Sequence, residues 1–583
     1  MFTLVLGLHF EGVWFSTMVE CGSEELAMNS ESAEAWLLRA QEIVYAALTK
    51  AREVRCFPGR WKMIASKLEQ IPSRLSDLSS HPFFSKNPLC KEQLQAVVNT
   101  ANDVISSSEL CAGEKYEGKL RTQSDLDALI GRLDLNLRDC GLLIKTGVLG
   151  EATVAEASSS SDSDSSASCN IRELLARLQI GHFESKRKAL DRLVEVLYED
   201  KKAVLAVLGR GNVAALVQLL TAASPRIHEK AAVIVSSVVE SGSGTFENWL
   251  VSEGVVPPLI RLLETGSGVG RDKALISLQK LSAAADTARA IVGRGGVRPL
   301  VEVCGTNDSV AQIASAGTLR NLSVVPETRR ELAEEGVVRA MIDLLDFGNL
   351  PGAKEYAAEC LRNLTLDDDD ESLRSLVISE GGFRSLLAYV DCHSPQEPAV
   401  SALGSLVDLI PTEALVSHGF LSHAAHALRS GSLGAKQAAA SAICRASASP
   451  GMKKMVGEAR CFPLLVNLLE AKPQGAREAA AQAISVLITL PHNGREFKKV
   501  AKCVPNLVHL LDPAPQNTAK KYAVASLVIL SSGRECRRQM IANGAIGYLK
   551  KLTETDVPGS KKLLEALERG SFRSLFRSRS MRF

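Results

Sequence analysis

The chain has 583 residues, of which 5% are aromatic and 23% are charged, and its 68 basic residues nearly balance its 66 acidic ones. That length exceeds what a single hydrophobic core usually supports, so several units or an array of repeats are expected. A net charge of +2 gives the whole chain no long-range field for nucleic acid, and no apolar run is long enough to span a membrane.

Residues 1–29 are predicted to be a flexible extension that is apolar at first and contains no Lys or Arg. A secretory signal needs a basic start and a small-residue cleavage site, and both are missing. We therefore expect the customary start of the protein at Met18 or Met28. The thirteen Cys are scattered without a Cys-x-x-Cys pair, which indicates reduced core thiols in an intracellular protein.

Residues 30–150 are predicted to fold as a bundle of four helices. Apolar residues recur at helical spacing in four segments, which are 33–52, 61–75, 90–105 and 124–144. Pro72 is expected to end or kink the second helix, because proline removes a helical hydrogen bond. Trp36 and Trp61 are expected to be core residues rather than ligand contacts.

Residues 151–170 are predicted to be a disordered linker, because this Ser- and Asp-rich stretch is too polar to bury a core. Ser159 and Ser161 each have an Asp three residues later, a pattern that acid-directed kinases use. The stretch is therefore either an unmodified spacer or a phosphorylated one.

From residue 171 to residue 556 the chain is organised by one motif, seen most clearly at Gly254-Val-Val-Pro-Pro-Leu-Ile-Arg-Leu-Leu263. It returns at a period of about 42 residues, which is typical of a solenoid. After a partial capping unit, each repeat is predicted to have a short helix, a middle helix that carries the motif, and a longer last helix. The Gly between the first two is expected to adopt the left-handed conformation. Nine copies begin at Gly211, Gly254, Gly295, Gly336, Gly381, Gly419, Arg460, Lys502 and Gly544.

The period, the Gly-Val-Val-x-x-Leu start and the Leu-Arg-Asn-Leu sequences at 319–322 and 361–364 resemble the armadillo repeat. This resemblance implies an all-α fold in which a right-handed armadillo-type α-solenoid follows the N-terminal helical bundle. Segments 57–65 and 133–144 resemble the helical domain before the U-box of plant U-box/armadillo ubiquitin ligases. Only the linker stands where those proteins have a U-box. The resemblance therefore implies a plant armadillo protein that lacks it.

In armadillo proteins the last helices line a concave groove, and we take Asn321 and Asn363 as the reference position in those helices. Nuclear-import receptors of this superfamily have repeated Asn there and Trp four residues earlier. This chain has Gly317 and Glu359 at the Trp position, so binding of basic peptides in the manner of an importin is disfavoured.

Nine residues before the reference position, five of eight repeats have a Lys or Arg, namely Arg271, Lys354, Lys436, Arg477 and Lys520. One interpretation is solvated charge that pairs with neighbours such as Glu355 and Glu478. The other is a groove for an acidic, extended peptide, to which further groove residues contribute: Lys280, Arg320, Arg362 and Arg445.

Residues 557–583 are predicted to form a C-terminal helix and a basic tail. Aromatic and aliphatic side chains alternate there with Arg573, Arg577, Arg579 and Arg582. Segments of this kind lie on anionic membrane surfaces, and the alternative is a disordered end.

No catalytic arrangement or cofactor motif stands out, and the cluster of His418, His423 and His426 lacks the ligand set of a metal site. We therefore expect a non-catalytic scaffold, cytoplasmic or nuclear, that binds a protein partner in its groove and needs no cofactor or metal. Two alternatives stay open. One is a component that recruits substrates for ubiquitin ligation in trans, and the other is a peripheral membrane adaptor that acts through the tail. No nucleic-acid partner is expected.

Overall fold

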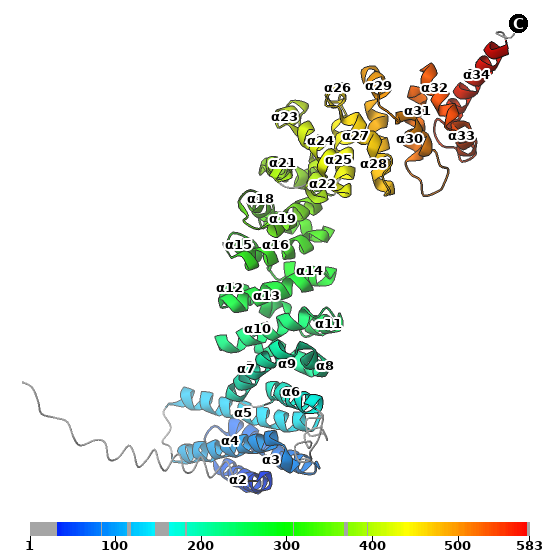
Figure 1. Ribbon diagram of the computed structural model, residues 1–583. Coiled ribbons are helices and arrows are strands. Elements are labelled where there is room, and N and C mark those ends of the chain that lie inside the picture. The colour runs from blue at the N-terminus through cyan, green and yellow to red at the C-terminus, as the bar shows by residue number, and fades with distance from the viewer. Residues whose placement is uncertain are drawn as a thin grey trace, which may run out of the picture. The chain divides into compact units, whose positions relative to one another are not determined.

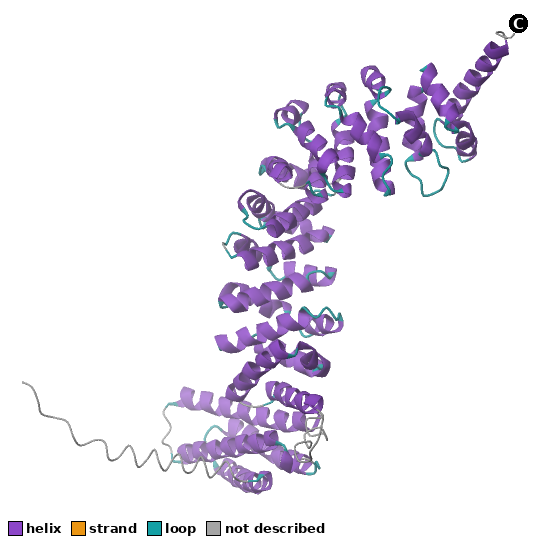
Figure 2. Ribbon diagram, viewed as in Figure 1, coloured by secondary structure: helices purple, strands orange, loops and turns teal. Residues whose placement is uncertain are grey.

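The secondary structure is helical throughout the part of the chain that the computed structural model describes, and that part contains no strand (Figure 1, Figure 2). The prediction of an all-α protein is confirmed. The chain divides into two compact units, Met1–Pro258 and Leu259–Phe583, called unit 1 and unit 2 below. The described residues are 32–82, 84–113, 118–145, 163–180, 183–306, 308–366, 371–392 and 395–579.

Four long helices make up the first part of unit 1. They are α2 (Ala33–Glu53), α3 (Pro58–Ser79), α4 (Pro88–Ala112) and α5 (Lys119–Lys145). Both α2 and α5 pack against α3 and α4. Trp36 and Trp61 lie in their shared core and are only 1% and 2% exposed. The prediction that both tryptophans are core residues is confirmed.

Helix α3 continues through Pro72 to Ser79, so of the two expected effects of this proline the end of the helix is wrong, and a kink stays a prediction. Ile71 and Leu75, on either side of Pro72, are both buried. Burial of this apolar face outweighs the single hydrogen bond that the proline removes.

The rest of unit 1 consists of shorter helices that lead into the repeats. Helix α6 begins at Ser163, so the end of the predicted linker lies within a helix, whereas Ser159 and Ser161 lie outside the described residues. Ala176 and Ile180, at the end of α6, belong to the core of the four long helices. These helices are α6 (Ser163–Gln179), α7 (Phe183–Glu199), α8 (Lys201–Val207), α9 (Arg210–Leu219), α10 (Pro225–Val239) and α11 (Thr245–Ser252), followed by α12 (Val256–Thr265).

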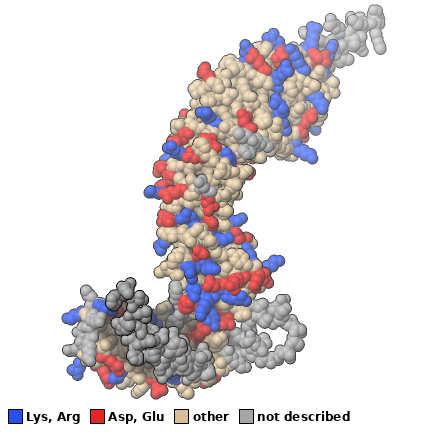
Figure 3. All heavy atoms as spheres, turned by 60° about the vertical axis from the view of Figure 1, so that its left-hand side comes forward, with Lys and Arg blue, Asp and Glu red and all other residues tan. Residues whose placement is uncertain are grey.

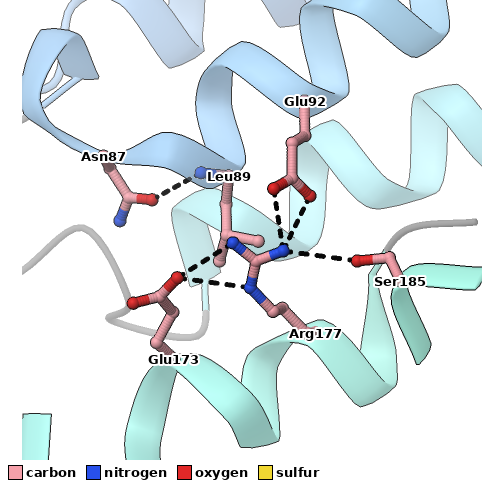
Figure 4. Close-up of polar contacts among 6 residues, drawn as sticks. All are labelled: Asn87, Leu89, Glu92, Glu173, Arg177 and Ser185. Carbon is pink, nitrogen blue, oxygen red and sulfur yellow. Dashed lines mark hydrogen bonds and ion pairs between the residues drawn. The ribbon is translucent and has the colours of Figure 1, made fainter. Parts of the chain in front are cut away.

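Arg177 connects three of these helices (Figure 4). Its Nη1 donates to the two carboxylate oxygens of Glu92 in α4 at 2.8 and 2.9 Å, and to Ser185 Oγ in α7 at 3.3 Å. Its Nη2 donates to Glu173 Oε1, one turn earlier in α6, at 3.0 Å. Hydrogen bonds between charged groups are stronger than neutral ones, and this guanidinium is only 20% exposed. The four long helices and the first repeat helices are therefore joined by polar as well as apolar contacts.

Unit 2 repeats a pattern of three helices. The short helices are α14 (Ala285–Val292), α17 (Arg329–Glu334), α20 (Glu371–Ser379), α23 (Thr412–Ser417), α26 (Pro450–Glu458), α29 (Pro491–Phe497) and α32 (Arg534–Ala542). The middle helices are α15 (Val297–Cys304), α18 (Val337–Phe347), α21 (Gly382–Cys392), α24 (Phe420–Ser430), α27 (Cys461–Leu468), α30 (Cys503–His509) and α33 (Ala545–Glu554). The last helices are α13 (Gly268–Leu281), α16 (Ser309–Val324), α19 (Pro351–Leu364), α22 (Glu397–Leu406), α25 (Leu433–Ala446), α28 (Gln474–Leu487), α31 (Lys520–Leu530) and α34 (Ser560–Arg579).

The last helices of successive repeats in unit 2 pack side by side, from α13 on α16 through to α31 on α34 (Figure 1). Their contact faces are rich in Ala, and Ala439, Ala480 and Ala523 are fully buried. Small side chains let neighbouring helix backbones approach closely, which explains why few aromatic residues are needed. The equivalent residues of neighbouring repeats consequently lie next to each other.

The start of the repeat motif adopts the expected left-handed conformation, with φ between 67° and 86° at the six glycines from Gly254 to Gly544. Arg460 and Lys502 occupy the same position and have φ values of 55° and 59°. Gly211 is the exception, because it lies inside α9. A left-handed conformation is costly for a residue that carries a Cβ atom, so these two repeats tolerate strain that the others avoid.

We expect Arg460→Gly to raise the free energy of unfolding of the protein by about 0.5–1 kcal/mol. Removing the Cβ relieves the left-handed strain, and the greater freedom of glycine in the unfolded chain offsets only part of the gain. Lys550→Gly is the matched control, since Lys550 is exposed inside α33 and glycine there should destabilise the helix by about 1 kcal/mol. Urea unfolding monitored by circular dichroism measures both effects. A loss of stability in Arg460→Gly would contradict the strain argument.

Candidate functional site

The last helices α19, α22 and α25 carry a groove with a volume of about 430 Å³. Helices α22 and α25 are very close together beneath it, because a Cβ placed on Gly404 would lie 3.2 Å from the Cβ of Ala442. Only small side chains fit between helices at that separation. The floor of the groove is therefore made of Ser401, Gly404, Ser405, Gly434, Ala438, Ser441 and Ala442.

Ion pairs stand at both sides of this groove. On one side, Arg362 Nη2 of α19 lies 3.4 Å from Glu397 Oε1 of α22. On the other, Arg445 Nη2 of α25 donates to Asp408 Oδ2 at 3.0 Å. Arg374 Nη1 approaches the same carboxylate oxygen at 3.1 Å, and its side chain is 5% exposed. Two of the arginines that were predicted for the groove, Arg362 and Arg445, are thus present at its walls, and each is paired with a carboxylate.

Arg320 repeats this arrangement one helix earlier in unit 2. Its Nε lies 2.9 Å from Glu359 Oε2 of α19, and its guanidinium carbon is 5.1 Å from the centre of the Tyr356 ring. The carboxylates that face these arginines come from the chain itself. A bound acidic peptide would have to compete with them, so the face formed by α16, α19, α22 and α25 favours a partner without strong negative charge.

The reference asparagines connect neighbouring helices. Asn321 Nδ2 donates to Gln279 O at 2.8 Å and to Ser282 Oγ at 3.0 Å, both in the preceding repeat. Asn363 is 6% exposed, and its Nδ2 donates to Ser323 Oγ at 3.1 Å. Both side-chain amides are therefore used between repeats, and Asn363 is too deeply buried to serve as a contact surface in this conformation.

The residues nine positions before the reference position make backbone contacts that the sequence analysis did not anticipate. Four of them donate to carbonyl groups at the end of the preceding middle helix or in the loop that follows it. The pairs are Gln312 Nε2 to Cys304 O (3.0 Å), Lys354 Nζ to Leu345 O (2.6 Å), Arg477 Nη1 to Ala471 O (3.4 Å) and Lys520 Nζ to Ala514 O (3.2 Å).

The contacts of Gln312 and Lys354 cap middle helices, because Cys304 and Leu345 lie in the last turns of α15 and α18, whereas Arg477 and Lys520 contact the loops after α27 and α30. The last carbonyl groups of a helix have no partner within the helix and carry partial negative charge, so cations stabilise that end. One interpretation of these positions was ion pairing with neighbours such as Glu355 and Glu478. Among the described residues, neither Lys354 nor Arg477 forms such an ion pair. The Glu478 carboxylate instead accepts a hydrogen bond from Thr518. For Lys354, Arg477 and Lys520, the structure shows these carbonyl contacts in place of solvated charge paired with neighbouring carboxylates, and the groove for an acidic, extended peptide stays a prediction.

The remaining predicted cations do not join the groove of α19, α22 and α25. Arg271 is half-buried on α13, and Lys280 is exposed at the end of the same helix. Lys436 is half-buried at the start of α25. The side chains of Arg573, Arg577 and Arg579 lie outside the described part of the structure, and so does the whole of Arg582.

Two of the three histidines of the cluster, His418 and His423, have structural partners. His423 places Nε2 2.9 Å from Asp391 Oδ2 and Nδ1 2.8 Å from Gly419 O. His418 packs edge-on against the ring of Phe383. Within the described ranges no three His, Cys, Asp or Glu side chains gather in a way that could hold a metal ion.

The cysteine thiols are core groups. Burial raises the pKa of the Cys90 and Cys140 thiols to about 12, and that of Cys360 also to about 12. A thiol with such a pKa stays protonated and is a poor nucleophile. The expectation of reduced core thiols is met by these residues.

Across the described residues, no single helix is long and apolar enough to cross a membrane. One pair of helices, α8 and α9, satisfies the length and composition criteria jointly, but the chain bends by 111° between them.

The carboxylates that pair with the groove arginines were not predicted from the sequence: Glu359, Glu397 and Asp408. A signal was available, because each lies a little less than one repeat period from its arginine. The period brings such positions together in neighbouring helices, as it does for Arg445 and Asp408. The small-residue floor could also have been noticed in the Ala- and Ser-rich sequence of α25.

Residues 38–148 match the model of a protein family that is described only as a domain of unknown function, DUF7032. This segment contains most of α2 and all of α3, α4 and α5. Among solved structures, the crystal structure of an engineered protein is similar, with a TM-score of 0.60 and 24% sequence identity. The similarity covers 68% of this chain and 99% of the engineered one, and it concerns the fold alone. No curated protein shows a significant match to the chain.

Proposed function

We propose that this protein is a non-catalytic scaffold that binds an extended segment of a partner protein in the groove across α19, α22 and α25. The observation that carries the proposal is the narrow floor of small side chains between two walls that are held by ion pairs. A peptide backbone can approach such a floor closely, which it could not do over large side chains.

The groove also offers polar groups that an extended backbone needs. Ser401, Gln437 and Ser441 line it, and none of their side chains makes a hydrogen bond to another described residue. An extended segment exposes an N–H or C=O group on either side at every residue, and these groups require partners when water is excluded. Hydroxyl and amide side chains both donate and accept, so they suit a backbone better than a particular side chain.

The charges favour a partner segment that is neither strongly acidic nor strongly basic. Because Arg362 and Arg445 are paired within the chain, little net charge is left to attract an oppositely charged peptide. Binding in the groove should therefore depend only weakly on salt concentration. This revises the expectation of an acidic peptide in this groove.

The fold assignment that accompanies this function is the right-handed armadillo type. The repeat period, the three-helix pattern and the left-handed motif start of unit 2 support it. Helices α2–α5 correspond in this proposal to the helical bundle that precedes the U-box in U-box/armadillo proteins. A scaffold without the U-box would present partners and perform no ubiquitin transfer of its own.

The groove is tested by filling it. Peptides selected from a displayed random library against the whole protein should lose about tenfold or more in affinity towards Ser441→Trp, because an indole would occupy the space above the floor. Fluorescence anisotropy with the selected peptides measures this. Ser401→Trp, from the neighbouring helix, should have the same effect.

Ser417→Trp is the matched control, because Ser417 is exposed on the short helix α23. The three variants should have the circular dichroism spectrum and melting temperature of the unmodified protein. If peptides bind the groove-filled variants as tightly as they bind the control, the groove is not the binding site and the proposal fails.

A further inference from the structure

A group of cations lies on the short helices at the C-terminal end of unit 2. We call it the short-helix stripe. It consists of the Lys and Arg residues of α26, α29 and α32, together with the two lysines directly after α29. Its eight members are Lys453, Lys454, Arg495, Lys498, Lys499, Arg534, Arg537 and Arg538. Only three carboxylates share these helices: Glu458, Glu496 and Glu535.

The stripe is continuous from one helix to the next. Helix α26 packs against α29. Lys498, just after α29, reaches the start of α32, because a Cβ placed on Gly533 would lie 3.4 Å from its Nζ. In Figure 3 Lys and Arg side chains gather on the part of unit 2 next to the C-terminal residues, whereas blue and red alternate farther along the unit.

The earlier short helices of unit 2 show no such excess. In α14, α17 and α20 the numbers of basic and acidic residues are equal, and α23 has a single Glu and no cation. The balanced net charge of the whole chain hides this difference. A local concentration of like charge creates a field that attracts opposite charge, even when the protein as a whole is nearly neutral.

Several cations of the stripe are available to a partner. The side chains of Arg495, Lys498 and Arg534 are exposed and make no hydrogen bond or ion pair to another described residue. Lys499 and Arg538 lie 2.7 and 3.7 Å from Glu496 and Glu535, but these pairs are exposed, and exposed pairs are weak. They can be exchanged for a partner's carboxylates at little cost.

We propose that the short-helix stripe binds an acidic, extended stretch of a partner protein, with carboxylates at about every third residue. Packed helices lie about 8–10 Å apart, and three residues of extended chain span about 10 Å. A carboxylate at every third position therefore meets one helix of the stripe after another.

Two other anionic partners fit the stripe less well. No large apolar side chain is exposed on α26, α29 or α32, and insertion into a membrane surface needs one. His492 of α29 is the one exposed aromatic side chain on these three helices, and a single imidazole provides no row of rings on which successive bases of single-stranded nucleic acid could stack. Each of the three helices carries one of the carboxylates Glu458, Glu496 and Glu535. These carboxylates would repel the closely spaced phosphates of a membrane surface or a nucleic acid, whereas the side-chain carboxylates of a peptide can be spaced to lie between them.

The experiment uses the full chain and a fluorescent peptide with Glu at every third residue, separated by Ser and Gly. Wild type should bind it with an affinity that falls about tenfold or more between about 50 and 200 mM salt. The triple variant Arg495→Glu/Lys498→Glu/Arg534→Glu should bind at least about tenfold more weakly at low salt. The corresponding triple Gln variant should lie between the two.

The matched control is Arg261→Glu/Arg339→Glu/Arg384→Glu, which makes the same change in net charge at exposed arginines of the middle helices α12, α18 and α21. Its affinity should stay within about twofold of wild type, because screening limits these charges to their own surroundings. A peptide of the same composition with its Glu residues in one block should bind more weakly than the spaced one.

The proposal is overturned if wild type shows no saturable binding of the spaced peptide, or if the stripe and control variants bind it equally. It is also overturned if the stripe variant loses binding to vesicles containing phosphatidylserine while it keeps the peptide, which would assign the stripe to a membrane. The groove-filled Ser441→Trp should bind the spaced peptide as wild type does. A failure of the groove proposal is thereby distinguished from a failure of this one.

Discussion

Replacing Arg374 by Met is expected to lower the free energy of unfolding of unit 2 by about 3 kcal/mol. The guanidinium is 5% exposed, and its Nη1 lies 3.1 Å from Asp408 Oδ2 and 3.2 Å from Ser405 O. Removing one member of a buried ion pair leaves the other group without its compensating charge, which costs about 3–5 kcal/mol when both are buried. Asp408 is 39% exposed, so water recovers part of that loss.

The two units can be monitored separately. All four tryptophans lie at or before residue 249 and therefore in unit 1, so tryptophan fluorescence monitors unit 1, while circular dichroism monitors both units. Arg374→Met should shift the circular dichroism transition to lower urea and leave the fluorescence transition in place. Arg384→Met, at an exposed site on the next helix, should change stability by less than about 0.5 kcal/mol. Equal stability of the two variants would contradict the assigned role of Arg374.

Arg374 also has a place in the proposed function. It shares the Asp408 carboxylate with Arg445, whose side chain forms one wall of the groove. Without Arg374, the Asp408 carboxylate loses one of its two arginine partners, and the position of the Arg445 side chain that it fixes in the groove wall becomes less well defined. We therefore expect groove peptides to bind Arg374→Met more weakly than wild type even under conditions where the variant is fully folded.

The repeats were predictable from the sequence because their signal is periodic. From Gly254 onward every copy of the motif has the same backbone requirement, a left-handed residue before the middle helix, and glycine meets it with the least strain. Arg460 and Lys502 were still recognised as motif starts, because the apolar spacing after them is unchanged. In a repeat protein, the period of the motif identifies which residues occupy the same position in successive repeats, and this can be read directly from the sequence.

The direction of a side chain could not be predicted in the same way. Lys354 and Lys436 occupy the same position of the repeat, yet the Lys354 side chain donates to a carbonyl and the Lys436 side chain makes no such contact among the described residues. The difference depends on where the preceding middle helix ends relative to the last helix, and this geometry is set by loops that the period does not describe. Whole-chain charge likewise hid the short-helix stripe, since an excess of cations at one end is cancelled in the sum by acidic residues elsewhere.

The double variant Lys354→Glu/Arg477→Glu is expected to destabilise unit 2 by about 3 kcal/mol. Each substitution replaces a donor by a carboxylate close to carbonyl groups that already carry partial negative charge. A charged hydrogen bond is lost at each site, and the larger share of the effect falls on Lys354, which makes the shorter bond at 2.6 Å. The two sites lie in different repeats, so the effects should add.

The same double variant separates capping from partner binding. Lys280→Glu/Arg384→Glu makes an equal change in net charge at exposed positions and should leave the circular dichroism transition within about 0.5 kcal/mol of wild type. If Lys354→Glu/Arg477→Glu loses a partner and also melts early, the loss follows from the broken carbonyl contacts and says nothing about the binding surface. If it melts like wild type, the carbonyl contacts contribute little. Both side chains would then be free to meet an acidic peptide, and the capping role would have to be abandoned.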